Sequence, residues 1–292
     1  MNLRTNLAGV VLENPVMNAS GTFSRESAEY TDVNKMGAVV TKGVSLEPWS
    51  GNPPPRIAET HGGMLNAVGL QNPGVEYFLR EELPFWKKFH TKIIVNIVGK
   101  TPEEYMAVAE RLRDADVDML ELNISCPNIK EGGIAIGTCA KQTERVTSAV
   151  KNAAKQPLIV KLSPNVTDIV EIAKAAEAGG ADALSLINTL LGMRIDVKTR
   201  RPLLGNIFGG LSGPAIKPVA LRMVYQVCGA VKIPVIGMGG VSNATDALEF
   251  LMAGASAVAV GSANFTNPRA IDSIIKELAA FCVDEVRGAA RI

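Results

Sequence analysis

The sequence predicts a closed (β/α)8 TIM barrel that forms a single domain over residues 1–292, with long active-site loops. Short apolar runs rich in β-branched residues recur along the chain, and amphipathic segments rich in Ala, Glu and Lys separate them, which is typical of parallel βαβ units. Eight such pairs can be counted, the number that closes a barrel. An open doubly wound sheet would favour a GxGxxG turn after an early strand, and the sequence has none.

The expected strands share an aliphatic or β-branched core, and each is followed by a segment that can form a helix. Their ends are polar or rich in glycine, as expected where a strand turns toward its helix. The strands are expected at 15–18, 38–41, 93–97, 119–125, 158–163, 183–188, 234–239 and 257–261.

Capping residues mark several helix ends. Thr101-Pro102-Glu103-Glu104 predicts a helix start, because Thr suits the N-cap, Pro the first helical position and Glu the third. Asn267-Pro268 repeats this arrangement. Gly179-Gly180 and Gly254 follow Ala-rich helices, where a residue with positive φ is needed before the next strand.

Two long connections interrupt the regular spacing. Residues 42–74 are rich in Pro and Gly, and residues 189–213 carry Arg194, Arg200 and Arg201. Connections of this length commonly serve as lids or binding elements.

The composition limits the classes of function. With 47% hydrophobic and 20% charged residues, the chain suits a globular protein, and a net charge of +1 gives no reason to expect nucleic acid as a partner. The four cysteines lack the spacing of a zinc site, so no metal is expected, and they suit a reduced cytoplasm. We find no signal peptide and no apolar run of transmembrane length, and we expect a cytoplasmic protein without a membrane anchor.

In a barrel of this type the C-terminal strand ends meet at one mouth, so their polar residues define a candidate site. For any single residue, a satisfied loop side chain or a helix cap is an alternative interpretation. The polar strand ends are Asn18-Ala19-Ser20-Gly21, Thr41-Lys42-Gly43, Asn96, the segment 123–128, Lys161 and Asn188-Thr189.

The last two strand ends consist of small residues. Gly237-Met238-Gly239-Gly240 and Gly261-Ser262 follow the seventh and eighth strands, the positions at which barrels often bind phosphate. Tight turns use the same residues, but the two positions together predict a phosphate site.

The sequence has only two histidines, His61 and His90, and His90 precedes a strand, where a surface position is expected, so the general base is sought among other residue types. Cys126 directly follows the fourth strand, and a thiol with a reference pKa of about 8.5 can be tuned to accept a proton near neutral pH. A buried free cysteine of the core is the alternative. Lys42 and Lys161 have two interpretations, as Schiff-base nucleophiles or as fixed charges beside an electron-rich cofactor.

Five motifs follow one another along the chain: Asn18-Ala19-Ser20-Gly21, Thr41-Lys42-Gly43, residues 66–72, residues 122–128 and Met238-Gly239-Gly240. Taken together, they resemble the class 1 dihydroorotate dehydrogenases over about residues 1–280.

Cys126 is typical of class 1, because class 2 enzymes carry serine there and an additional N-terminal segment. Residues 66–74 and 124–133 resemble the B type, although Ile136-Gly137-Thr138-Cys139 departs from the Phe-Gly-Thr-acidic pattern that we expect of it. No role is assigned to Cys139, Cys228 or Cys282.

This resemblance implies that the chain oxidises (S)-dihydroorotate to orotate in pyrimidine (UMP) biosynthesis, with one FMN per chain. It also implies an iron–sulfur flavoprotein partner subunit that carries FAD and a [2Fe-2S] cluster and passes electrons to NAD, around a homodimer core in a heterotetramer. An A-type homodimer that uses fumarate is the alternative. A Schiff-base aldolase that uses Lys161 on the same barrel is a more remote one.

The resemblance also implies roles for individual residues. Cys126 takes the C5 proton of dihydroorotate while hydride passes from C6 to FMN. The FMN phosphate is expected at Gly213, Gly239, Gly240, Gly261 and Ser262, and its ring at Ser20, Lys42, Gly43, Asn96, Asn123, Lys161 and Ile187. Substrate contacts are expected from Lys42, Asn66, Ala67, Val68, Gly69, Leu70, Asn123, Asn188 and Thr189.

Overall fold

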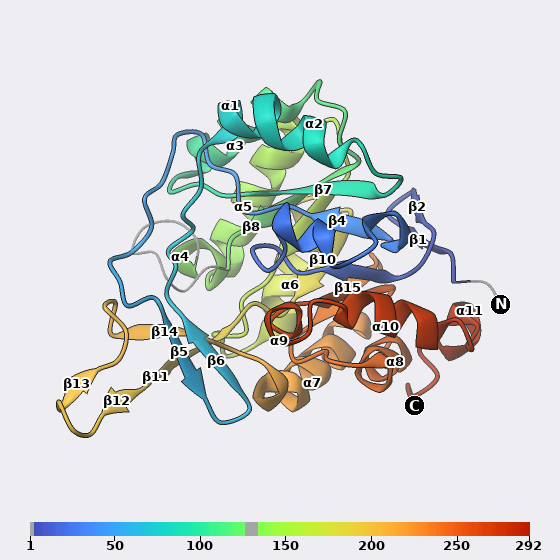
Figure 1. Ribbon diagram of the computed structural model, residues 1–292. Coiled ribbons are helices and arrows are strands. Elements are labelled where there is room, and N and C mark those ends of the chain that lie inside the picture. Colours follow the sequence, from blue (N-terminus) through green and yellow to red (C-terminus); the bar gives the residue numbers. More distant parts are fainter. Residues whose placement is uncertain (1–2, 126–133) are drawn as a thin grey trace.

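The computed structural model describes residues 3–125 and 134–292, and its centre is a closed barrel of eight parallel strands (Figure 1). Each expected strand overlaps one barrel strand, so the predicted (β/α)8 fold is confirmed. Around the barrel the strand order is β10-β15-β16-β3-β4-β7-β8-β9. The strands are β3 (Val16–Asn18), β4 (Ala38–Val40), β7 (Lys92–Ile97), β8 (Met119–Asn123), β9 (Leu158–Lys161), β10 (Ala183–Leu186), β15 (Val235–Met238) and β16 (Ala257–Val260).

Helices cover the outside of the barrel (Figure 1). No helix of the described residues is long and apolar enough to cross a bilayer. The longer helices are α3 (Pro102–Leu112), α5 (Ala140–Ala153), α6 (Ile169–Ala178), α7 (Lys217–Cys228), α8 (Ala244–Met252) and α10 (Ala270–Leu278). The short ones are α1 (Val75–Tyr77), η3 (Phe78–Glu82), α2 (Leu83–Trp86), α4 (Ile134–Gly137), η4 (Pro214–Ile216), α9 (Ala263–Thr266) and α11 (Val283–Val286).

The connection after β3 differs from the expected helix. Residues 19–37, all of which the structure describes, contain only two 3-10 helices, η1 (Glu26–Glu29) and η2 (Val33–Lys35). The Ser27 hydroxyl accepts the backbone N–H of Ser24 at 3.1 Å, and the Asp32 carboxylate accepts that of Asn34 at 3.2 Å. Such local side-chain bonds compete with a continuous helix, which explains the difference.

The predicted helix ends are largely confirmed. The Thr101 hydroxyl accepts the N–H of Glu104 at 3.3 Å, as an N-cap should. Gly180 and Gly254 have φ of 91° and 111°, the left-handed conformation that precedes the next strand. The start predicted at Asn267-Pro268 is shifted, because Asn267 is not the N-cap: its amide oxygen accepts the N–H of Arg269 at 3.1 Å, and α10 begins only at Ala270.

The barrel interior is apolar at one end and polar at the other. A hairpin of β1 (Thr5–Leu7) and β2 (Val10–Leu12) packs Leu7 and Leu12 against the inward residues Met17, Ile94 and Met119. Two residues further along the strands, the corresponding positions hold the buried polar side chains of Asn96, Glu121, Lys161 and Ser185. Because alternate residues of a strand face the same side, β7, β8, β9 and β10 each carry an apolar inward residue below a polar one, whereas at β3, β4, β15 and β16 the second level holds the apolar Ala19, Val40, Met238 and Ala259.

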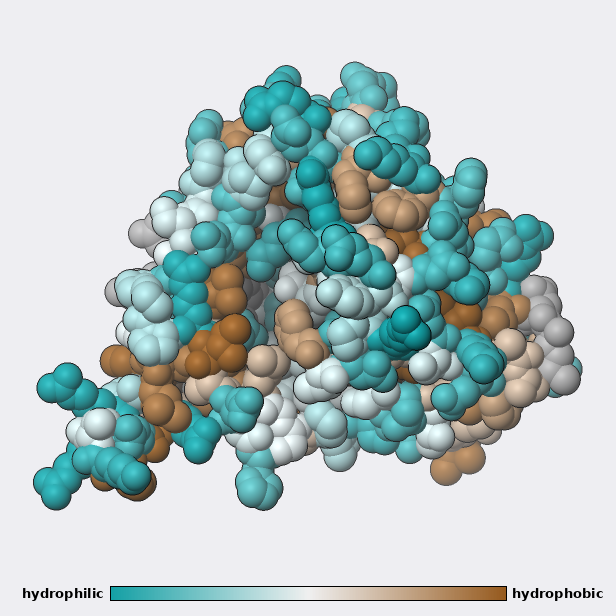
Figure 2. Space-filling model, in the orientation of Figure 1, coloured by the Kyte–Doolittle hydropathy of each residue, from teal (hydrophilic) through white to brown (hydrophobic). Residues whose placement is uncertain are grey.

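The two long connections form a small antiparallel sheet together, which the sequence analysis did not predict. Its strand order is β11-β14-β6-β5, and β14 pairs with β6 so that Gly210 lies opposite Asn66. The sheet lies beside the barrel mouth (Figure 1), and Figure 2 shows apolar residues on it at the edge of a central hollow. The strands are β5 (Ile57–Thr60), β6 (Gly63–Asn66), β11 (Leu190–Met193) and β14 (Phe208–Ser212), with β12 (Ile195–Asp196) and β13 (Arg201–Pro202) in a projecting hairpin.

Candidate active site

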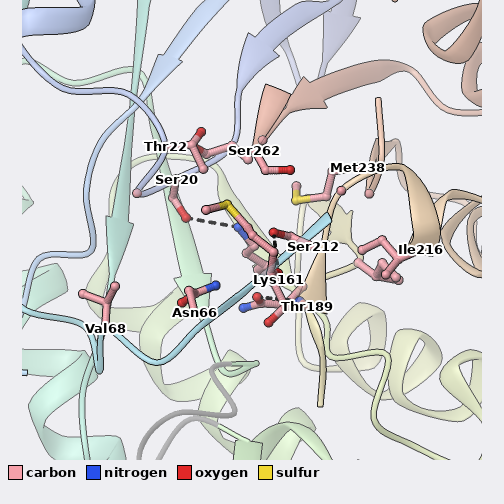
Figure 3. Close-up of a pocket in the computed structure, with 18 of the residues that line it drawn as sticks. Ser20, Thr22, Asn66, Val68, Lys161, Thr189, Ser212, Ile216, Met238 and Ser262 are labelled. Atoms are coloured by element: carbon pink, nitrogen blue, oxygen red, sulfur yellow. Dashed lines mark hydrogen bonds between the residues drawn. The ribbon is translucent and has the colours of Figure 1, made fainter. Parts of the chain in front are cut away.

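A cavity lies at the C-terminal ends of the barrel strands, and the empty space there is about 1220 Å³, which includes open solvent at its mouth. Every strand end and the small sheet contribute to its wall (Figure 3). All the residues expected to contact FMN line it: Ser20, Lys42, Gly43, Asn96, Asn123, Lys161, Ile187, Gly213, Gly239, Gly240, Gly261 and Ser262.

Most of the residues expected to contact the substrate line the same cavity. The exception is Ala67, which is buried with Leu65 and Leu204 in a separate apolar cluster. Alternate residues of an extended segment face opposite sides, so Ala67 points away from the cavity while its neighbours point into it. Those that line the cavity are Lys42, Asn66, Val68, Gly69, Leu70, Asn123, Asn188 and Thr189.

Lys161 places a buried cation at the floor of the cavity. Its ammonium lies 3.1 Å from the Ser20 hydroxyl and 3.9 Å from the Glu121 carboxylate (Figure 3 draws the contact with Ser20). The side chains of Lys161 and Glu121 are only 5% and 3% exposed. Because so little solvent screens this charge, it interacts strongly with a molecule that binds in the cavity above it.

Glu121 anchors the polar layer of the barrel. Its two carboxylate oxygens accept the Asn96 amide N–H at 2.6 Å and the Ser185 hydroxyl at 2.7 Å. Glu121 was not predicted as a site residue from the sequence. The available signal was an acidic residue within the apolar run Met119-Leu120-Glu121-Leu122, because a charge in a buried strand requires partners.

Two further amides tie the ends of β8 and β10 together. The Asn188 amide donates to the Ser125 hydroxyl at 2.9 Å, and that hydroxyl donates to the Asn123 side chain at 3.1 Å. Tyr105 donates to the Asn123 backbone oxygen at 2.8 Å. These bonds fix the chain up to Ser125; the predicted base, Cys126, lies outside the described residues.

Two glycines keep the space around Lys42 open. A Cβ on Gly21, whose φ is 76°, would approach the Lys42 ammonium to 3.3 Å. A Cβ on Gly43 would approach the Asn96 amide oxygen to 3.2 Å. Both contacts are tighter than ordinary packing, so larger residues would displace side chains that line the cavity.

The opposite end of the cavity has a wall of glycine backbone. Gly239 and Gly240 have φ of 126° and 78°, and a Cβ on either would come within 3 Å of α7 residues, at 2.6 Å from Ala220 and 2.8 Å from Lys217. Gly261 differs, because a Cβ there would find its nearest neighbour, Ala19, at 3.8 Å. Gly239 and Gly240 are thus required by packing, whereas Gly261 leaves room in the cavity.

An ion cluster holds the turn after β15. The Lys217 ammonium lies 2.6 Å from Asp246 and 2.8 Å from Glu249, and hydrogen bonds to these two carboxylates raise the Lys217 pKa above its ordinary value of 10.5. The second Asp246 oxygen accepts the backbone N–H of Ser242 at 2.9 Å. Asp246 therefore connects the start of α7 to the glycine turn.

The sequence analysis also missed lining residues that come from the small sheet and from the loops. No local pattern identifies them, because the pairing within the small sheet brings Ile57, Met64 and Ser212 to the mouth and the others lie in loops and short helices. They include Thr22, Ile57, Met64, Ser212, Ile216 and Phe265.

The chemistry of this donor set fits a flavin mononucleotide. At one end of the cavity the glycine turns expose backbone that no side chain covers, and an anion can approach it closely. The other end offers a cation, amides and hydroxyls, which suit the polar edge of a planar heterocycle. A flavin is therefore compatible with the residues present.

Comparisons with known proteins agree with this geometry. A family profile described as "Dihydroorotate dehydrogenase" matches residues 2–282. The chain is 64% identical over 283 residues to a protein of Alkaliphilus metalliredigens named "Dihydroorotate dehydrogenase B (NAD(+)), catalytic subunit", covering 96% of this chain and 94% of the relative. A protein of the same name from Lachnoclostridium phytofermentans is 61% identical, with the same coverage. A solved structure of Eimeria tenella DHODH in complex with ferulenol superposes with a TM-score of 0.82 at 22% identity, covering 99% of this chain and 88% of that one, which supports the fold.

Proposed function

The chain belongs to the dihydroorotate dehydrogenase family, and from that membership we propose that it is the catalytic subunit of a B-type, NAD-linked enzyme. The proposed reaction is oxidation of (S)-dihydroorotate to orotate in pyrimidine biosynthesis. The observation that carries the proposal is the convergence of the expected flavin contacts on one cavity, in a chain 64% identical to a B-type catalytic subunit.

One FMN per chain is proposed for the cavity. When bound, FMN supplies the acceptor for the hydride that leaves C6 of dihydroorotate. Lys161 holds a positive charge at the proposed ring site and so favours electron density there. Ser20 fixes the Lys161 ammonium through their 3.1 Å contact. The glycine turns after β15 and β16 leave backbone exposed for the phosphate.

The mouth residues are proposed to bind dihydroorotate. Lys42 offers an ammonium that can pair with the substrate carboxylate. Asn66, Asn123 and Asn188 offer amides that can match the amide edges of the ring. Since Asn123 and Asn188 are tied to each other through Ser125, they present these groups in a fixed orientation, which lowers the entropic cost of aligning the substrate.

Cys126 is proposed as the base that removes the C5 proton. It directly follows Ser125, whose hydroxyl is held between Asn123 and Asn188. A thiolate is a competent base near neutral pH, because the reference pKa of a thiol is about 8.5.

The electrons are proposed to leave through a partner subunit. The relatives' names describe a catalytic subunit that uses NAD(+). We assign FAD and a [2Fe-2S] cluster to an iron–sulfur flavoprotein partner, because the four cysteines here are not spaced as cluster ligands. A homodimer of this chain is proposed as the core of the heterotetramer.

Steady-state assays with and without the partner test this proposal. We expect orotate formation with NAD only when the partner is present, and little activity of the isolated chain with fumarate. Rapid turnover with fumarate by the isolated chain would instead support an A-type enzyme. A lack of orotate formation with every acceptor, in protein loaded with FMN, would refute the proposed activity.

A further inference from the structure

Glu121 carries a buried carboxylate that the proposed function leaves without a role. Its side chain is 3% exposed and lies inside the barrel, two residues before Asn123 on β8. Removing a charge from water in this way is costly unless hydrogen bonds and an opposite charge compensate. Asn96, Ser185 and Lys161 supply that compensation.

A chain of hydrogen bonds leads from the cavity wall to this carboxylate, and each donor points toward it. The backbone N–H of Thr189 begins the chain and Glu121 ends it. The successive bonds are Thr189 N to Asn188 Oδ1 (2.7 Å), Asn188 Nδ2 to Ser125 Oγ (2.9 Å), Ser125 Oγ to Asn123 Oδ1 (3.1 Å), Asn123 Nδ2 to Asn96 Oδ1 (3.2 Å) and Asn96 Nδ2 to Glu121 Oε2 (2.6 Å).

The two ends fix the direction of this chain. A backbone N–H can only donate and an ionised carboxylate can only accept. The three amides between them therefore cannot flip without leaving a buried donor facing a donor. Each amide keeps a second N–H that can bind a molecule in the cavity. The donor and the acceptor at the two ends of the hydrogen-bond chain therefore determine which amide atoms face the cavity.

Glu121 also faces the buried cation. Its Oε2 lies 3.9 Å from the Lys161 ammonium, and both groups are nearly free of solvent contact. The carboxylate thus offsets part of the positive charge that Lys161 presents to the cavity.

On the basis of the proposed function, we propose that Glu121 is a positioning residue with two effects. As the acceptor at the end of the chain it orients the amides of Asn96, Asn123 and Asn188 toward the ring and the substrate. Its negative charge, beside Lys161, lowers the reduction potential of the bound flavin.

Two variants of nearly equal size separate these effects. In Glu121→Gln the side-chain oxygen can still accept from Asn96 and its amide can donate to the Ser185 hydroxyl, so only the charge is lost. In Glu121→Met both the acceptor and the charge are lost. Ser185→Ala serves as the matched control, because it removes one hydrogen bond but keeps the carboxylate and the chain.

The readouts are the midpoint potential of the bound FMN, from a redox titration with indicator dyes, and the Kd of orotate, from its effect on the flavin absorbance. Glu121→Gln is expected to raise the equilibrium constant for flavin reduction about tenfold, a shift of about 30 mV for a two-electron couple, and to leave the orotate Kd nearly unchanged. Glu121→Met is expected to weaken orotate binding about tenfold, because it leaves a buried amide donor without an acceptor. Ser185→Ala is expected to change both quantities much less.

An unchanged potential in Glu121→Gln, or an unchanged orotate Kd in Glu121→Met, would overturn the proposal. Each variant tests a separate effect of Glu121. If one variant does not fold, the other can still refute the proposal. Wild-type protein that binds neither FMN nor orotate would overturn the proposed function itself, and this inference with it. The two kinds of failure are therefore distinguishable.

Discussion

Replacing Asp246 with Asn should loosen the glycine turn and weaken FMN binding. Asp246 uses both oxygens as acceptors, one for Lys217 at 2.6 Å and one for the Ser242 backbone N–H at 2.9 Å. Asn offers a single oxygen, so its NH2 group must face one of these donors. Losing a hydrogen bond of this kind costs about 1.5–3 kcal/mol in a buried site. Because the Lys217 side chain is 25% exposed, we expect about 1–2 kcal/mol, or about a tenfold rise in the FMN Kd.

The Kd can be measured by the quenching of FMN fluorescence on titration into apoprotein, alongside thermal unfolding. Glu249→Gln is the matched control, since Glu249 also pairs with Lys217 but is 39% exposed, and it should change the Kd less than about twofold. The raised Lys217 pKa sets the pH window: the pair stabilises the fold fully below pH 10.5 and loses its effect as the pH rises through the higher folded value. An unchanged FMN Kd in Asp246→Asn would refute the proposed link between Asp246 and the glycine turn. A difference in stability between wild type and Asp246→Asn that stays the same well above pH 10.5 would refute it too.

Three more predictions follow from single positions. Gly261→Ala should keep the melting temperature but weaken FMN binding, because its Cβ would enter open cavity space. Gly239→Ala should lower the melting temperature, because its Cβ would lie 2.6 Å from Ala220. Equal melting temperatures of the two variants would contradict this prediction. Burial raises the pKa of Cys228 to about 12, so iodoacetamide should label the exposed Cys139 and spare Cys228 in native protein at pH 8, as mass spectrometry can check. Cys126→Ser should slow flavin reduction by dihydroorotate about a hundredfold at pH 7 in stopped-flow experiments; a wild-type rate would exclude Cys126 as the base.

The barrel could be predicted from the sequence because its signals are local. Each strand is a short apolar run that ends in a turn, and Thr101 or Gly254 marks a helix end within a few residues of it. The small sheet could not be predicted in this way. Its central pair joins Asn66 to Gly210, segments far apart in the sequence whose pairing leaves no periodic pattern at either one.

The residues of the candidate site also differ in whether local sequence signals could predict them. Strand-end residues such as Lys161 and Asn123 follow from the barrel topology and from the family resemblance. Glu121 and Asp246 act through other side chains, and their importance depends on distances that only the folded chain defines. Ala67 was predicted with its neighbours because the motif is contiguous, but it does not line the cavity, since alternate residues of an extended segment face opposite ways.

We expect (S)-dihydroorotate to reduce the FMN proposed for this chain directly. The most direct measurement mixes the FMN-loaded chain anaerobically with (S)-dihydroorotate and follows the flavin absorbance together with orotate formation. We predict loss of the oxidised flavin band with one orotate formed per flavin, in the absence of any partner. A flavin that binds stoichiometrically but remains oxidised in the presence of excess dihydroorotate would contradict the proposed function.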